Sequence, residues 1–339
     1  MPGPDRRIAG GCRVSEKRGW DNAFTAPGPY GTVKGSPSYA GALSFMRRKY
    51  SRDLAGVDVA VVGIPLDTAT TNRPGARFGP RAVRAASAGI SWERPWPWNF
   101  DPFDRLAVVD YGDCEFDPGR PETIVPFVED YFGTILDAGA AALTLGGDHF
   151  VTYPVLRAYA QRHGPLSLVH FDAHSDTWGE EQQRLDHGTM FYHAVKQGLV
   201  DDSRSVQIGL RTTNDEPLGF NILDSRRVHS QGPEAVAAKV KHIVGDNKVY
   251  LTFDIDCLDP SYAPGTGTPV CGGLSTHQAL EITRGLAGID LVGMDVVEVA
   301  PAYDVGEITA LAGATLAAEF LCLFAANPRC EGQGKGSVE

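Results

Sequence analysis

The chain alternates short apolar runs with amphipathic stretches from Val57 almost to its C-terminus. The apolar runs are rich in Val, Ile and Leu without strict alternation, as expected of strands buried on both faces. The stretches between them repeat apolar residues at helical spacing. This order predicts a parallel α/β sheet with right-handed crossovers. The expected strands are residues 57–65, 105–111, 141–146, 166–171, 205–210, 249–255 and 291–299, and the expected helices are residues 122–140, 151–162, 232–244, 275–287 and 306–326.

Periodicity alone leaves two architectures open, an open sheet with helices on both faces and an eight-stranded barrel. At 339 residues the chain is long for one domain, but α/β chains of this size do fold as one. We expect residues 1–55, which are rich in Gly, Pro and basic side chains, to form an extension with one short helix near 40–50. This extension would pack on the core or on a neighbouring subunit. Residues 56–326 then form one α/β domain, and residues 327–339 a flexible tail.

Composition narrows the class of protein. No run approaches 18 uninterrupted apolar residues, and the N-terminus lacks an apolar stretch of signal-peptide type, so we expect no membrane partner. The formal net charge of −11 argues against nucleic acid as a partner and mildly favours a cationic ligand. The six cysteines are scattered without a CxxC pair, which predicts reduced thiols in a cytoplasmic protein.

Three of the apolar runs end in clusters of Asp and His. The clusters are GGDH at 146–149, FDAHSD at 171–176 and FDIDCLDP at 253–260. Because ligands bind just beyond the carboxyl ends of parallel strands, these clusters are expected to meet at one edge of the sheet. A single Asp or His after a strand is usually a cap or a satisfied core group, but six in three clusters indicate a metal site. The candidate metal ligands are His149, Asp172, His174, Asp176, Asp254 and Asp256.

Four carboxylates and two imidazoles suit oxygen-preferring divalent ions, above all Mn²⁺, although Co²⁺, Ni²⁺ or Zn²⁺ would also bind. Two ions about 4 Å apart can share one water and lower its pKa towards neutrality. Four aspartates and a bridging hydroxide against two divalent ions leave a net charge of −1, which suits a cationic substrate. Cys257 lies inside the third cluster, where we expect a small buried neighbour, not a ligand. The histidines outside the clusters are expected to be structural, apart from His187; among them, His170 would support the site.

The ordered motifs identify a family resemblance. GGDHF, HFDAHSDT, DHGTMF, TFDIDCLDP, APGTGTP and GMDVVEVAPAYD stand between about residues 57 and 325 in an order and spacing similar to the ureohydrolase family. That family includes arginase, agmatinase and guanidino-acid hydrolases. The resemblance implies an open, mostly parallel sheet flanked by helices on both faces, with residues 56–326 as the catalytic domain. It also implies a homo-oligomer, trimer or hexamer, with a hetero-oligomer containing a paralogue as an alternative.

The resemblance further implies two divalent metal ions per subunit. His149 and Asp176 would bind one ion and His174 and Asp256 the other, with Asp172 and Asp254 bridging. Asp176 would also orient the bridging hydroxide. His187, in LDHGTMF, matches the family's proton-shuttling histidine, a suitable carrier near neutral pH. Glu298, in DVVEV, matches the glutamate that pairs with the guanidinium of the substrate.

The implied reaction is attack of metal-bound hydroxide on a guanidinium carbon, followed by C–N cleavage to urea and an amine. Two other classes stay open at this point. A non-catalytic subunit could keep the fold and act only as the partner of an active paralogue, although the full ligand set argues against it. A deacetylase of related fold would need a ligand set centred on one zinc, which this sequence does not show.

The substrate is less constrained than the reaction. Trp178 stands where arginase-type sequences have Asn, which disfavours arginine, and PWNFD, DHGTMFY, DIDCLDP and APAYD resemble agmatinase. We therefore expect hydrolysis of agmatine to putrescine and urea. Hydrolysis of 4-guanidinobutyrate, 3-guanidinopropionate, free guanidine or an alkylated biguanide such as metformin stays open.

Two segments are expected near the entrance of the site. Residues 72–84, NRPGARFGPRAVR, contain Gly and Pro residues that predict a loop. Its arginines at 73, 77 and 81 could contact an anionic tail, but structural roles are favoured. Residues 177–186 precede His187 and bring Trp178, a candidate substrate-binding residue, together with the charged Glu180, Glu181 and Arg184.

Overall fold

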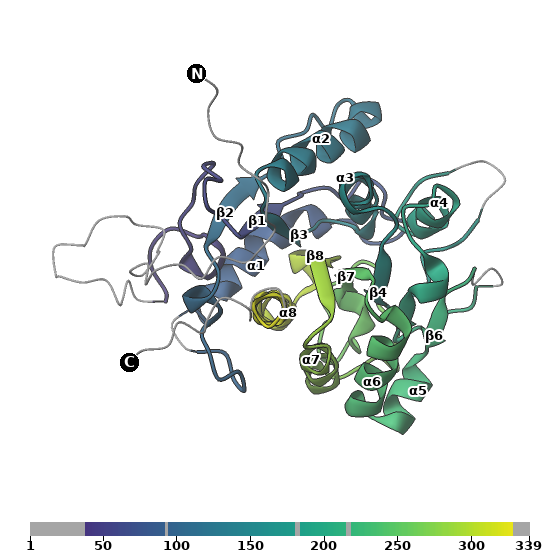
Figure 1. The fold of residues 1–339 in the computed structure, drawn as a ribbon. Coiled ribbons are helices and arrows are strands. Elements are labelled where there is room, and N and C mark those ends of the chain that lie inside the picture. Colours follow the sequence, from purple (N-terminus) through teal and green to yellow (C-terminus); the bar gives the residue numbers. More distant parts are fainter. Residues whose placement is uncertain (1–37, 92–93, 180–183, 215–217, 328–339) are drawn as a thin grey trace, which may run out of the picture.

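A single eight-stranded sheet forms the centre of the computed structural model, which describes residues 38–91, 94–179, 184–214 and 218–327 (Figure 1). Every pairing between its strands is parallel. The strand order is β2-β1-β3-β8-β7-β4-β5-β6, with β2 and β6 as the two edge strands, so the open sheet, not the barrel, is confirmed. The strands are β1 (Val59–Gly63), β2 (Val108–Asp113), β3 (Ala141–Leu145), β4 (Ser167–Phe171), β5 (Val206–Ile208), β6 (Asn221–Leu223), β7 (Lys248–Asp254) and β8 (Asp290–Val297).

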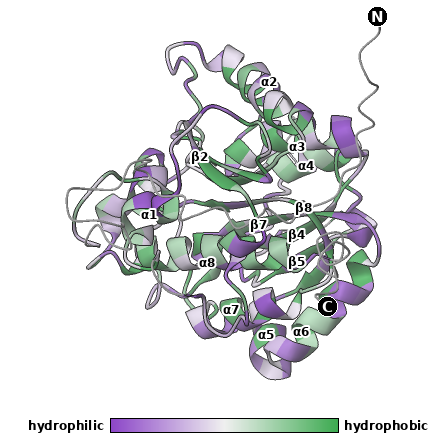
Figure 2. Ribbon diagram, turned by 60° about the vertical axis from the view of Figure 1, so that its left-hand side comes forward, coloured by the Kyte–Doolittle hydropathy of each residue, from purple (hydrophilic) through white to green (hydrophobic). Residues whose placement is uncertain are grey.

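Helices cover both faces of the sheet (Figures 1 and 2). One layer packs α2 (Ile124–Asp137) on α3 (Thr152–His163), and α3 on α4 (Met190–Lys196). The other layer packs in the order α1, α8, α7, α6, α5. Its members are α1 (Gly79–Ser87), α5 (Ser225–Gln231), α6 (Pro233–Val244), α7 (Thr276–Gly285) and α8 (Ile308–Ala325).

Successive side chains of the strands face opposite helix layers. Val59 and Val61 of β1 belong to one apolar cluster, whereas Ala60 and Val62 belong to the other. Figure 2 shows the strands as a hydrophobic layer between the helices. Within the described residues, α8 is the one helix long and apolar enough to cross a membrane, but 78% of its apolar window is buried inside the fold. Helix α8 therefore has the surroundings of a core helix.

All seven expected strands and all five expected helices are present, with ends that differ by a few residues. The expectation of a loop over residues 72–84 is wrong in its second half, where the turn η2 (Ala76–Phe78) leads into α1. Pro80 lies in the first turn of α1, where a missing N–H costs no helical hydrogen bond, so its presence does not exclude a helix. The short elements β6, α4 and α5 were missed because each has too few residues for a clear period.

The described part of the N-terminal extension contacts the core. Its short helix is a single 3-10 turn, η1 (Phe45–Arg47), in which Phe45 and Met46 are fully or nearly fully buried. The Phe45 N–H donates to Oδ2 of Asp110 at 2.7 Å, which ties this segment to β2. Residues 1–37 and the expected tail at 328–339 lie outside the described residues, so the proposed domain limits stay predictions.

A glycine holds the turn after β3 against the turn after β1. The carbonyl of Gly147 accepts the Glu298 N–H at 2.7 Å, and the next N–H, of Asp148, donates to the Leu66 carbonyl at 2.7 Å. A Cβ on Gly147 would overlap the backbone of Leu66. The absence of a side chain therefore allows three chain segments to meet at the carboxyl edge of the sheet.

We predict that Gly147→Ala destabilises the protein by about 3 kcal/mol, because backbone atoms must move to admit the methyl group. Gly133→Ala in α2 is the matched control, since a Cβ there meets nothing within 4 Å. The control is expected to be neutral or to stabilise by about 0.5–1 kcal/mol. Urea denaturation of both variants measures the difference, and equal stabilities would contradict the prediction.

Candidate active site

The polar clusters meet at the carboxyl ends of the four central strands. Strands β3, β8, β7 and β4 are neighbours in the sheet, although β3 and β8 are far apart in sequence. His149 begins the turn η5 (His149–Val151) after β3, and Asp172 directly follows β4. Asp254 ends β7, and Glu298 directly follows β8. The fold therefore gathers the predicted residues where ligands of parallel sheets bind.

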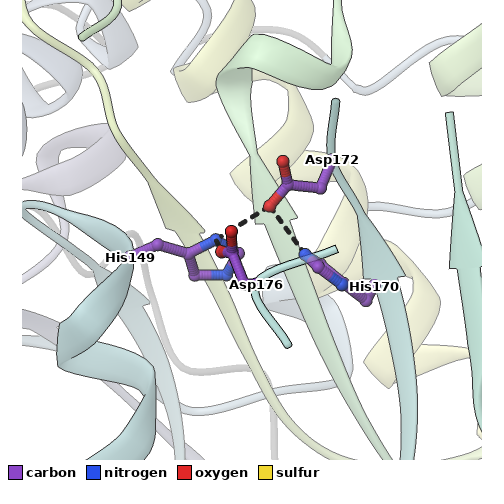
Figure 3. Close-up of side chains that lie close together, drawn as sticks. All are labelled: His149, His170, Asp172 and Asp176. Atoms are coloured by element: carbon purple, nitrogen blue, oxygen red, sulfur yellow. Dashed lines mark hydrogen bonds and ion pairs between the residues drawn. The ribbon is translucent and has the colours of Figure 1, made fainter. Parts of the chain in front are cut away.

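One group of possible ligand atoms comes from His149, His170, Asp172 and Asp176, which Figure 3 shows close together. Nδ1 of His149 lies 3.0 Å from Oδ2 of Asp172 and 3.0 Å from Oδ2 of Asp176. Oδ2 of Asp254 is 3.3 Å from the same nitrogen. This nitrogen is buried and has no hydrogen bond of acceptable geometry within the described part of the chain. Four converging donor atoms with an unsatisfied nitrogen fit a divalent cation.

A second group lies beside the first. Nδ1 of His174 is 3.0 Å from Oδ2 of Asp256 and 3.3 Å from Oδ1 of Asp172. The two oxygens of Asp172 therefore face different groups, the geometry expected of a bridging carboxylate. All six predicted ligands are brought together, and no other such cluster occurs among the residues that the structure describes.

His170 supports this cluster and does not offer a free nitrogen to it. Gln207 Nε2 donates to the Ser175 carbonyl at 2.6 Å, so the amide nitrogen also faces His170 Nδ1, at 3.1 Å. Nδ1 thus accepts, and Nε2–H donates to Oδ2 of Asp172 at 2.7 Å. Burial lowers the pKa of His170 and favours this neutral form. The expected structural role of His170 agrees with these contacts.

The cluster carries charges that are costly without a cation. Burial and the neighbouring Asp172 raise the pKa of Asp176 to about 7, and burial with Asp256 raises the pKa of Asp254 well above its ordinary value. Burial opposes a charged His149 ring, but the surrounding carboxylates outweigh it and raise its pKa. In the absence of ions, protons must therefore reduce the repulsion that divalent ions would remove.

Glu298 offers a carboxylate oxygen without a partner. Its Oε1 accepts the His149 N–H at 2.9 Å and faces Nδ1 of His187 at 2.9 Å. Its Oε2 is buried and has no hydrogen-bond partner among the described residues. A Cβ on Gly267 would lie 3.3 Å from Oε2, so the glycine leaves room beside this oxygen. Glu298 also has a φ of 63°, a strained conformation that proteins tend to keep at functional sites.

His187 is held by a loop that the sequence motifs did not identify. The Thr71 N–H donates to its Nε2 at 3.0 Å, and Oγ1 of Thr71 is 2.8 Å from the same atom. These contacts require an unprotonated Nε2 and so favour the neutral ring. Glu298 acts against this preference. Burial lowers the pKa of His187, but the hydrogen bond and the charge of Glu298 outweigh burial and raise that pKa to about 9. Ala69, two residues before Thr71, donates to buried Asp148 at 2.8 Å and so fixes the loop.

A cavity of 230 Å³ opens above the polar cluster. Half-buried Trp178 lines it, as predicted from the sequence, and so does Arg184, whose Nε lies 2.5 Å from Oδ2 of Asp186. Glu180 and Glu181 fall outside the described residues. The remaining lining residues are Thr71, His174, Asp176, His187, Gly188, Thr189, Asp254 and Thr268.

Two of the three loop arginines have structural contacts. Arg73 stacks over the ring of Tyr303, 5.2 Å from its centroid, and Arg77 forms an ion pair with buried Asp67. Neither arginine lines the cavity. These contacts agree with the structural role that the sequence favoured for both arginines.

Comparison with known proteins gives the same family by three routes. Agmatinase of Chromobacterium violaceum is 58% identical over 306 residues, which cover 90% of this chain and 95% of that protein. The crystal structure of a hypothetical agmatinase from Burkholderia thailandensis is 58% identical, with a TM-score of 0.85, over 90% of this chain and 97% of that one. The structure of proclavaminate amidino hydrolase from Streptomyces clavuligerus is 37% identical, with a TM-score of 0.81. The match covers 86% of this chain and 99% of that one. The arginase family model matches residues 57–323, and the chain therefore belongs to the arginase family.

Proposed function

We propose that this protein is an agmatinase that hydrolyses agmatine to urea and putrescine with two bound divalent ions. As a member of the arginase family it is a hydrolase of amidino C–N bonds. The observation that carries the proposal is the unpartnered, buried Oε2 of Glu298 next to a cluster of six metal-type ligands. The close relatives named agmatinase support the choice of substrate.

Six side chains would hold the ions. We propose His149 and Asp176 for one ion, His174 and Asp256 for the other, and Asp172 and Asp254 as ligands shared by both. The proposal is supported by the contacts of His149 with Asp172, Asp176 and Asp254, and of His174 with Asp172 and Asp256. We propose Mn²⁺, with Ni²⁺ or Co²⁺ as alternatives, because carboxylate oxygens outnumber imidazoles. When bound, such ions act as Lewis acids and activate water near neutral pH.

Glu298 would bind the guanidinium group of the substrate. A planar guanidinium presents paired N–H donors that match a carboxylate, and the free Oε2 of Glu298 is available for such a bond. Oε1 is already fixed by the His149 N–H, so the carboxylate orientation is set before substrate arrives. Asp176, at a φ of 51°, would accept a hydrogen bond from the attacking water and orient it.

His187 would carry the proton to the leaving amine. Nδ1 of His187 lies 2.9 Å from Oε1 of Glu298, beside the oxygen that would bind the guanidinium. The charge of Glu298 raises the pKa of His187, whereas the Thr71 N–H at Nε2 favours the neutral ring. An imidazole under these opposed influences is suited to take up and release a proton near neutral pH.

The tail of the substrate would lie in the cavity against Trp178. An indole face attracts an ammonium group and does not require an acidic partner, which suits the terminal amine of agmatine. A second candidate substrate is 4-guanidinobutyrate, because Arg184 also lines the cavity and could face a carboxylate. Asp186 lies against Arg184 and reduces its net charge, so we favour agmatine.

We also propose a reducing, cytoplasmic location and a homo-oligomer, trimer or hexamer, built from the catalytic domain at residues 56–326. The described cysteines 114, 257, 271 and 322 are free thiols, as expected of a reducing compartment. Val305, just before α8, is 67% exposed, and Ile308 and Leu311, at the start of α8, are 41% and 45% exposed. Exposed apolar side chains close together in sequence suit a subunit interface.

Urea release from a panel of guanidines tests the proposed substrate. The panel contains agmatine, 4-guanidinobutyrate, 3-guanidinopropionate, arginine, guanidine and dimethylbiguanide, each with Mn²⁺ and with Ni²⁺. We expect agmatine to give the highest kcat/KM and putrescine as the second product. Agmatine among the poorest substrates would refute the agmatinase assignment, and no urea from any guanidine would refute the enzyme.

The two proposed catalytic groups are expected to respond differently to substitution. Glu298→Gln keeps the shape but removes the charge, so kcat/KM for agmatine should fall about 100- to 1,000-fold. His187→Asn should lower kcat about 100-fold or more with little change in KM, because proton transfer and not binding is lost. Steady-state kinetics measure both, with exposed Glu122→Gln as the control. Activity within two-fold of the unaltered enzyme in either site variant would count against its role.

Metal loading is expected to stabilise the protein more at pH 8 than at pH 6. Burial raises the pKa of Asp176 to about 7, so the metal-free fold loses stability as pH rises from about 4 through 7. His149, with a raised pKa, likewise contributes stability below about pH 6.5 that is lost as pH rises. Divalent ions bind the deprotonated ligands and reverse this trend. Tm values of EDTA-treated and Mn²⁺-loaded protein give the difference, and a gap that narrows with rising pH would contradict the prediction.

A further inference from the structure

A fully buried aspartate lies behind the candidate metal site and has no part in the proposed reaction. Asp295 belongs to β8 and does not line the cavity. Its Oδ2 accepts hydrogen bonds from the hydroxyls of Thr152 and Tyr250, both at 2.9 Å. Its Oδ1 accepts from Oγ1 of Thr252 at 2.6 Å. Burying a carboxylate costs free energy, so a buried aspartate with this many hydrogen bonds is expected to have a specific role.

Thr252 connects this carboxylate to a proposed metal ligand. Its Oγ1 lies 2.8 Å from Nε2 of His149. A hydroxyl has one proton, and Thr252 donates that proton to Asp295, so only a lone pair is left to face the ring. Nε2 of His149 must therefore carry a hydrogen and donate it to Thr252.

This direction of hydrogen bonding fixes the other nitrogen of His149. A neutral imidazole carries one N–H, so a proton on Nε2 leaves a lone pair on Nδ1. Nδ1 is the atom that faces Asp172, Asp176 and Asp254. Without an acceptor at position 295, the Thr252 hydroxyl could turn and donate to Nε2. The ring proton would then sit on Nδ1, where it blocks a metal ion.

The other partners of Asp295 keep it an acceptor. Burial raises the pKa of the Tyr250 phenol well above its ordinary value, so Tyr250 stays protonated and donates. Burial raises the pKa of Asp295, whereas hydrogen bonds from Thr252, Thr152 and Tyr250 oppose that rise. All three hydroxyls point at the carboxylate as donors, so the geometry makes it an acceptor. The register of the sheet fixes the hydrogen bond between Thr252 and Asp295, because these two residues are directly paired between β7 and β8.

We propose that Asp295, acting through Thr252, is a positioning residue that sets the tautomer and ring orientation of His149 for binding a divalent ion. The inference rests on the two-metal site of the proposed function. Hydrogen-bonded groups behind a metal-bound histidine affect metal affinity about 10- to 100-fold. The effect should fall on the ion held by His149 and leave the ion held by His174 nearly unchanged.

Metal binding to the full-length protein tests the inference without reference to activity. EDTA-treated protein is titrated with Mn²⁺ by calorimetry, and bound metal is counted after dialysis. Asp295→Asn keeps the shape of the side chain, but its amide can donate a hydrogen bond to Thr252, which would then donate to Nε2 of His149. Thr252→Val removes the hydroxyl altogether. We expect both variants to bind one of the two ions about 10- to 100-fold more weakly. Thr252→Ser keeps the hydroxyl and should restore the affinity.

Thr152→Val is the matched control, because it removes a donor to Asp295 but leaves the Thr252 link to His149 intact. It should bind both ions within about three-fold of the unaltered protein. Circular dichroism and Tm of the metal-free variants show which of them fold, and metal affinities are compared only among the folded variants. Unchanged affinity in folded Thr252→Val and Asp295→Asn would overturn the inference, as would an equal loss in Thr152→Val. If the unaltered protein itself binds no ions, the proposed function fails instead.

Discussion

Repulsion between buried carboxylates at the edge of the sheet is the constraint on which the rest of this structure depends. Asp172, Asp176 and Asp254 all bring an oxygen within 3.3 Å of the same His149 nitrogen. At such spacing the negative charges cannot all persist in a buried site without a compensating cation. Burial, together with the neighbouring carboxylates, raises the pKa of both Asp176 and Asp254 when no ion is bound. A site that is costly without ions and satisfied with them is well suited to hold divalent metals tightly.

The sheet maintains this concentration of charge by topology. Strands β8 and β7 lie between β3 and β4, so residues from four distant segments share one edge. The contact between His149 and Glu298 joins positions 149 residues apart, through the N–H of one and the carboxylate of the other. Asp176 and Glu298 both have φ in the left-handed region, so the local backbone is strained at two of the candidate catalytic carboxylates. The rigid sheet and its two helix layers hold that strain.

The sequence predicted the strands and the six ligands because both are local patterns. An apolar run followed by Asp or His identifies a strand end, and parallel strand ends share an edge. Thr71, Thr252 and Asp295 could not be found in this way. The role of Thr252 depends on its register with Asp295 across two strands, and that of Thr71 on a loop that returns to His187. Helix α1 was missed for a different reason, because its Gly and Pro residues are typical of loops as well as of first turns.

The same division explains why the reaction is easier to infer than the substrate. In the proposed reaction the candidate ligands, Glu298 and His187 would all act on the guanidinium end, and all of these except His187 lie at or just after strand ends. The tail is met by side chains on the loops around the cavity, where Trp178 and the Arg184–Asp186 pair are the distinguishing features. Among the described residues, Asp186 offsets the charge of Arg184, and the aromatic face of Trp178 can accept a cationic tail. In the proposed enzyme, charge at the reaction centre would therefore select a guanidinium, whereas the residues that line the cavity around Trp178 and Arg184 would bear on what that guanidinium is attached to.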